Sequence, residues 1–195
     1  MIRQLQHLAP RRLLSTAEAL AVAELQAQRL RQLLGVTDGA LSERQLRAIG
    51  GIIIERVPDL GVSGATRQID RRWVILLNRD DPPVRQRFTI AHELKHILDH
   101  PATLAIHASG TQAKQQTWLT ERICDYFAAC LLMPRPLVKR AWTTGSQDVR
   151  SLADRFQVSL DAMRIRLEQI GLVEPVGRCS PESPDVVPLV ARSAA

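Results

Sequence analysis

The sequence predicts an α+β fold in which a small antiparallel sheet precedes a metal-binding helix. Three observations support this prediction. Between residues 52 and 78, runs of β-branched and apolar residues are typical of short strands. Residues 84–98 then repeat apolar side chains at helical spacing and contain an H-E-x-x-H motif. Residues 147–171 have the pattern of two short helices joined by a tight turn.

Two capping boxes predict the helices that open the chain. Ser15 with Glu18, and Ser42 with Gln45, each place a serine three residues before a glutamate or glutamine. In such a box the serine side chain and the later side chain each satisfy a free N–H group of the first helical turn. We expect residues 1–50 to form helices that pack on a central core.

Three segments, 52–57, 66–70 and 73–78, predict the strands of the sheet. The last two are joined by Arg71 and Arg72, a polar link that indicates a hairpin. With the helices that follow, this sheet is expected to form the core, residues 51–140.

The H-E-x-x-H motif lies on a helix predicted to begin near Pro83 and to end before Pro101. Helical residues four apart lie on one face about 5–6 Å from each other. His92 and His96 can therefore bind one metal ion, which zinc does at about 2.0–2.1 Å. Glu93 lies beside the ion and can take a proton from a water molecule there. The alternative is a chance match on a solvated helix face, a risk that any short motif carries.

A third ligand emerges by elimination. His100 continues the four-residue spacing, but eight residues of helix rise about 12 Å, too far to share one ion with His92. A Gly-Thr-x-x-Asp pattern fails because Lys114 stands at the carboxylate position. Glu121 remains, at the head of an apolar helix, and Asp125 one turn later can accept the free ring N–H of a liganding histidine. The alternative is that both carboxylates are ordinary surface charges.

Two stretches resemble the ImmA/IrrE family of metallo-endopeptidases. They are Arg-Phe-Thr-x-Ala-His-Glu-Leu-x-His at 87–96 and Glu-x-x-x-Asp-x-Phe-Ala-x-x-Leu-Leu-Met-Pro at 121–134. The resemblance covers about residues 50–135. It implies a zincin-like minimal metalloprotease with His92, His96 and Glu121 as ligands and Glu93 as the catalytic base.

The chain departs from the family pattern at two positions. The family often has Asn where this chain has Asp125, which keeps a hydrogen-bond acceptor, and Gly where it has Lys95. We expect Lys95 to face outward on its helix, where the change would matter little. The resemblance also implies that members cut cytoplasmic transcriptional repressors that control stress, phage or mobile-element genes.

The C-terminal third predicts a helical region, 141–173, followed by a tail, 174–195. In the first, Ser159 caps the second helix of a helix-turn-helix-like pair. That helix is expected to expose Arg164 and Arg166, which either read DNA or buttress the core, and we favour the second role. The tail contains several prolines and serines and is expected to be disordered. His107, in the link between the two site helices, is a candidate substrate contact or a solvated loop residue.

Composition bounds the remaining possibilities. The net charge of +6 suits an acidic partner or nucleic acid, but its arginines are dispersed as on ordinary surfaces, so direct DNA binding is not favoured. Three cysteines make no disulfide framework, and no apolar leader or membrane span is evident. We therefore expect a cytoplasmic protein without membrane contact, and the oligomeric state is left open.

Together with the family resemblance, which supplies the substrate class, these observations predict a zinc-dependent endopeptidase that makes limited cuts in a helix-turn-helix repressor. Manganese suits the same donors as zinc. The alternative is a non-catalytic DNA- or protein-binding regulatory module, or a toxin–antitoxin component, built on the same scaffold. An intact Glu93 argues against that alternative, because a retired site has no chemical need for a base.

Overall fold

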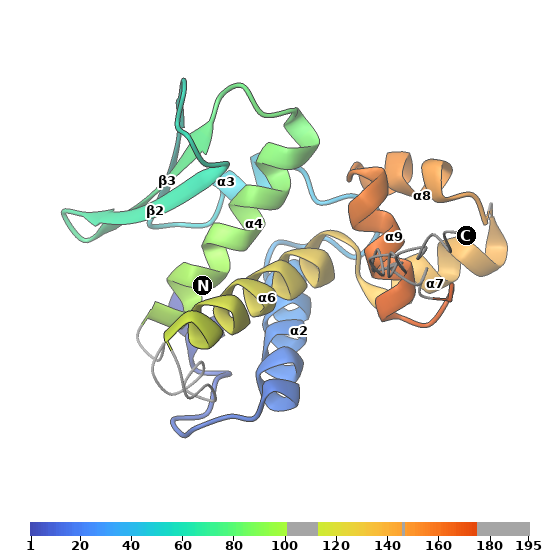
Figure 1. Ribbon diagram of the computed structural model, residues 1–195, viewed down its shortest axis with the longest axis horizontal. Coiled ribbons are helices and arrows are strands. Elements are labelled where there is room, and N and C mark those ends of the chain that lie inside the picture. Colours follow the sequence, from blue (N-terminus) through green and yellow to red (C-terminus); the bar gives the residue numbers. More distant parts are fainter. Residues whose placement is uncertain (101–112, 146, 175–195) are drawn as a thin grey trace, which may run out of the picture.

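A computed structural model describes residues 1–100, 113–145 and 147–174 of the chain, with side chains from residue 117 onward in the second range. It confirms the α+β fold class. Figure 1 shows three parts: a small sheet, a group of crossing helices beside it, and a separate cluster of C-terminal helices. Residues 175–195 of the predicted tail, and His107, lie outside the described residues.

Three strands form the sheet: β1 (Ile52–Val57), β2 (Gly64–Ile69) and β3 (Arg72–Asn78), in the order β1-β3-β2. The predicted hairpin is confirmed, since β2 and β3 are antiparallel with Thr66 opposite Ile75. Its turn places Asp70 and Arg71 at φ 45° and 64°, the left-handed conformation of tight two-residue hairpins.

The expectation of an antiparallel sheet was wrong for one pair of strands. β1 runs parallel to β3, with Ile54 opposite Ile75. The central position of β3 has a physical reason, because its run from Trp73 to Leu77 is continuously apolar and such strands suit the middle of a sheet. The order of strands is not encoded in their individual patterns, which is why the sequence indicated only the hairpin.

The helices beside the sheet pack around one apolar core. Both predicted capping boxes are confirmed, at Ser15 and Ser42. Small residues at four-residue spacing on the second helix, Ala19, Ala23 and Ala27, are fully buried, which suits a close approach to its neighbours. The helices are α1 (Ile2–Gln6), α2 (Thr16–Leu33), α3 (Glu43–Arg47), α4 (Pro83–Asp99) and α6 (Ala113–Leu132).

Lys95 corrects a prediction about the α4 surface. Its side chain is 0% exposed rather than outward-facing, and its ammonium donates to Asp99 Oδ1 at 2.6 Å and to Gln26 Oε1 at 2.8 Å. Gln26 in turn donates from Nε2 to the carbonyl of Leu5 at 3.0 Å. This buried chain of hydrogen bonds joins α1, α2 and α4, so the N-terminal helices are structurally continuous with the motif helix.

The C-terminal cluster contains α7 (Arg135–Thr144), α8 (Val149–Phe156) and α9 (Leu160–Gln169), and Ser159 caps α9 as predicted. The expected exposure of Arg166 was wrong. This side chain is 1% exposed and donates from Nε to the carbonyl of Met133, at the end of α6. Arg87 makes a similar link from α4 to Gln157 Oε1 and Phe156 O. Both arginines therefore fasten the cluster to the core.

No helix in the described ranges combines the length and apolar character that a membrane crossing requires.

Candidate metal centre

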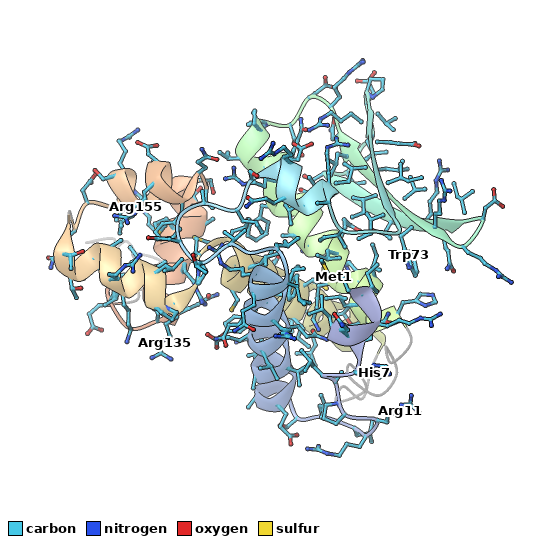
Figure 2. All side chains as sticks on the ribbon, turned by 180° about the vertical axis from the view of Figure 1, so that it is seen from behind. Met1, His7, Arg11, Trp73, Arg135 and Arg155 are labelled. Atoms are coloured by element: carbon cyan, nitrogen blue, oxygen red, sulfur yellow. The ribbon has the colours of Figure 1, made fainter. Side chains whose placement is uncertain are left out.

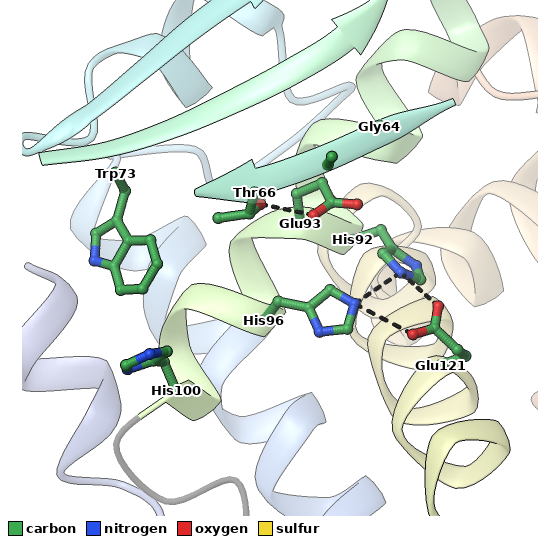
Figure 3. A pocket seen from close by; sticks show the side chains of 9 residues that line it. Gly64, Thr66, Trp73, His92, Glu93, His96, His100 and Glu121 are labelled. Carbon is green, nitrogen blue, oxygen red and sulfur yellow. Dashed lines mark hydrogen bonds and ion pairs between the residues drawn. The ribbon is translucent and has the colours of Figure 1, made fainter. Parts of the chain in front are cut away.

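The site lies between β2, α4 and α6, where a pocket of about 450 Å³ opens to solvent (Figure 3). The helical spacing of α4 sets His92 and His96 on its pocket-facing side, with Glu93 turned toward β2. Glu121 reaches the same space from α6. The lining residues are Gly64, Ala65, Thr66, Trp73, His92, Glu93, His96, His100 and Glu121.

Three side chains bring their donor atoms into one small triangle. The Nε2 atoms of His92 and His96 lie 3.2 Å apart. Glu121 Oε2 lies 3.2 Å from His92 Nε2, and its other oxygen lies 3.5 Å from His96 Nε2. Zinc with bonds of about 2.0–2.1 Å in tetrahedral geometry separates its ligand atoms by about 3.3–3.4 Å. Glu121 faces the two rings through different oxygens, and all three separations are close to the spacing that a tetrahedral ion requires, with a fourth position left over.

The second ring nitrogen of His92 also has a hydrogen-bond partner. His92 Nδ1 lies 2.9 Å from Asp125 Oδ1, one turn after Glu121 on α6. Burial opposes a positive charge on His92, but the nearby carboxylates, Asp125 foremost, outweigh it and raise the pKa of His92 above its ordinary value. Burial and the neighbouring His92 lower the pKa of His96. The Asp125 contact favours a His92 tautomer that keeps Nε2 free for a ligand bond.

Cys124 is a competing donor that the sequence interpretation did not assign to the site. Its sulfur and the ring nitrogens of His92 and His96 lie within 4.8 Å of one another. However, Cys124 is fully buried, and burial raises the pKa of its thiol well above the ordinary value, whereas metals bind the thiolate. The Glu121 oxygens are also at ligand spacing from both rings, so Glu121 is a second candidate for the third donor.

The side chain of Glu93 points toward the sheet. Glu93 is 8% exposed, and its Oε2 atom accepts a hydrogen bond of 2.6 Å from Thr66 Oγ1 on β2. β2 comes this close because of Gly64, where a Cβ atom would overlap Thr89 Cγ2 on α4. The carboxylate is thus held beside the two histidines by a strand contact.

The sequence pattern did not identify Thr66, Gly64 or Trp73 as lining residues. Alternation along β2 was the available signal, because residues 64, 66 and 68 of a strand share one face. His100, excluded as a ligand by its distance along the helix, lies instead against Trp73 with ring centroids 5.0 Å apart. Figure 3 shows this aromatic pair at the end of the pocket away from Glu121.

Comparisons with known proteins identify the family. Residues 51–168 match a peptidase family described as the IrrE N-terminal-like domain, and the chain belongs to that family. The family is a metallopeptidase family, which implies a metal ion at such a site.

Two relatives are radiation response metalloproteases named IrrE. The one from Deinococcus radiodurans is 33% identical over 119 residues, which cover 57% of this chain and 36% of the relative. The one from Deinococcus deserti is 37% identical over 86 residues, covering 42% and 30%. This chain therefore spans about a third of the length of the curated relatives that it matches.

A solved structure shares the fold. A Mycobacterium tuberculosis transcriptional regulator superposes with a TM-score of 0.63 at 23% identity, covering 75% of this chain and 46% of the regulator. At this identity the likeness concerns the fold alone.

Proposed function

We propose that the chain is a zinc-dependent endopeptidase whose ion is held by His92, His96 and Glu121. The observation that supports this most directly is the convergence of the three side chains, with 3.2 Å between the two Nε2 atoms and 3.2 and 3.5 Å from these atoms to the two Glu121 oxygens. Carboxylate and imidazole donors also suit manganese, so the donor set alone does not select zinc. Three protein ligands with one position open is the arrangement of catalytic rather than structural zinc.

In this proposal the ion, when bound, polarises the scissile carbonyl and makes a water molecule more acidic. Glu93 takes the proton from that water and passes it to the leaving amine, as a general base and then a general acid. Asp125 orients His92 through its Nδ1. The low exposure of Glu93 limits competing bulk water around the carboxylate.

The free edge of β2 supplies a place for an extended substrate. β2 pairs with β3 on one side only, and no described strand lies on the other side. A peptide added there gains main-chain hydrogen bonds and passes directly over Glu93. Such an edge accepts a flexible linker or an exposed strand rather than a folded domain, which favours one or a few cuts.

We propose a cytoplasmic helix-turn-helix repressor as the substrate class. The family resemblance supports it, and the two relatives are named radiation response metalloproteases. Direct DNA binding is not favoured, because Arg166 is buried. Arg135 and Arg155 lie on the C-terminal cluster, well away from the pocket residue Trp73 (Figure 2).

The test is to incubate the zinc-loaded protein with candidate helix-turn-helix repressors from the same genome, with casein and with a Glu93→Gln variant as controls. Discrete repressor fragments, with casein intact and no cleavage by Glu93→Gln, are the expected result. Binding of the repressor without cleavage, with either zinc or manganese, contradicts the protease and favours a non-catalytic regulatory module.

A further inference from the structure

Thr66 and Glu93 belong to different elements and meet in a single hydrogen bond. Thr66 Oγ1 donates to Glu93 Oε2 at 2.6 Å, from β2 to α4 (Figure 3). Among the described residues, Thr66 is the side chain that donates to this carboxylate. A hydrogen bond to a charged acceptor is shorter and stronger than one between neutral groups. One oxygen of Glu93 is therefore fixed, and the other remains available toward the histidines.

The main chain of Thr66 faces the free edge of the sheet. Asn78 N–H donates to Ser63 O at 2.9 Å, which makes that opposite pair a hydrogen-bonded one. Hydrogen-bonded and non-hydrogen-bonded pairs alternate along an antiparallel ladder. From the register, positions 65 and 67 bond to β3, while the N–H and C=O groups of Gly64 and Thr66 point away from it.

The same alternation is visible on the other side of β3. Trp73 N–H donates to Gly51 O, toward β1, at 3.0 Å. Trp73 is one of the β3 positions that the ladder predicts to face β1 rather than β2. The assignment of Thr66 to the free edge thus rests on hydrogen bonds at both sides of the central strand.

We propose that Thr66 is a positioning residue that couples docking of a substrate strand to the orientation of Glu93. A peptide that hydrogen-bonds to the main chain of Thr66 fixes β2 in place. The side chain of Thr66 on that strand in turn holds the Glu93 carboxylate. Loss of the hydroxyl frees the Glu93 carboxylate to rotate, while the edge that pairs with the peptide keeps its main-chain groups. This inference rests on the endopeptidase function proposed above.

The experiment compares Thr66→Val, which is close in shape but lacks the hydroxyl, with Thr66→Ser, which restores it. With the repressor that the wild type cleaves in the test above as probe, Thr66→Val should lower kcat by about 10–100-fold, because misplacement of a catalytic group by about 1 Å has effects of that size. KM should change by less than about threefold, and the zinc content should stay the same. Thr66→Ser should recover most of kcat.

Arg67→Val is the matched control for a substitution in β2. Arg67 is exposed, lies on the opposite face of the strand and has no contact with Glu93 in the described structure. Its kcat should stay close to that of the wild type. Equal loss in Thr66→Val, Thr66→Ser and Arg67→Val would show a general weakness of the strand and overturn the proposal, as would a Thr66→Val effect confined to KM.

A crystal structure of zinc-loaded Thr66→Val gives a readout that needs no turnover. More than one rotamer of Glu93, against one in the wild type, supports the positioning role, and a single unchanged rotamer overturns it. The two proposals fail differently. Absence of cleavage by the wild type defeats the endopeptidase function, whereas wild-type cleavage with full kcat in Thr66→Val defeats only the role of Thr66.

Discussion

His92 and Asp125 are joined across two helices, with Nδ1 of the ring 2.9 Å from Oδ1 of the carboxylate. The contact places a charged acceptor behind a ring whose other nitrogen belongs to the donor triangle. Outer contacts of this kind fix the tautomer and the orientation of a metal-binding histidine, and their loss typically costs 10–100-fold in metal affinity or activity.

Asp125→Ala should therefore weaken zinc binding by about 10–100-fold. Asp125→Asn should be milder, because its amide oxygen still accepts the ring N–H. Competition with a chromophoric chelator at pH 8 measures both affinities. Equal and negligible effects in both variants would show that Asp125 is an ordinary surface charge, in keeping with its 61% exposed side chain.

The deficit of Asp125→Ala should shrink as the pH falls. The carboxylates raise the pKa of His92, so protons compete with the metal at a higher pH in the wild type than for an ordinary histidine. Removing Asp125 lowers the pKa of His92, so protons compete less with the metal than in the wild type. The same change also weakens metal binding. Affinities measured between pH 8 and pH 6 should converge, and a constant ratio over that range would contradict the electrostatic role.

Glu121→Ala and Cys124→Ala should separate the two candidate third donors. If Glu121 is the ligand, metal analysis should show a strong drop from about one equivalent in Glu121→Ala. In Cys124→Ala the metal content should be unchanged, with only the modest loss of stability expected for a smaller buried side chain. The reverse result would assign the ion to the buried sulfur and leave Glu121 as a neighbouring charge.

The spacing of His92, Glu93 and His96 was readable in the sequence because helical geometry is local. The same holds for the capping boxes and the β2–β3 hairpin, where neighbouring residues determine the structure. The position of β1 beside β3 depends on how strands compete for the centre of the sheet, which no single strand reveals. The Thr66–Glu93 contact depends on that packing too.

Lys95 and Arg166 show why charge was a poor guide to exposure. A lysine or arginine on a helix is ordinarily solvated, and burial is tolerated only with partners. Asp99 lies one turn from Lys95 on the same helix, but the other partners are distant in sequence: Gln26 lies on α2, and the Met133 carbonyl lies at the end of α6. Pairs of this kind become visible only once the helices are placed together.

Gly64→Ala should destabilise the protein, because its Cβ would overlap Thr89 Cγ2 and lie close to the Leu76 carbonyl oxygen. Overpacking of this kind costs about 1–3 kcal/mol. Thr89→Ser removes the methyl group in question and keeps the hydroxyl, so the double variant should recover part of the loss. Urea unfolding of the four proteins measures the coupling, and strict additivity would show that β2 relaxes away from α4 without strain.

Lys95→Met should lower the free energy of unfolding by about 3 kcal/mol, because it leaves the Asp99 carboxylate buried without its ammonium partner. For a chain of this size, that corresponds to a Tm lower by about 6–12 °C. Adding Asp99→Asn removes the buried charge that has lost the Lys95 ammonium and should recover much of the loss. Lys139→Met, at a partly exposed position on α7, is the control, and its free energy of unfolding should stay within about 0.5 kcal/mol of the wild-type value.

Thermal unfolding of the metal-free proteins keeps metal binding out of the comparison. A Lys95→Met variant as stable as the control would mean that the lysine makes no net contribution from its buried position, and that its bonds to Gln26 and Asp99 do no more than offset the cost of burying its charge.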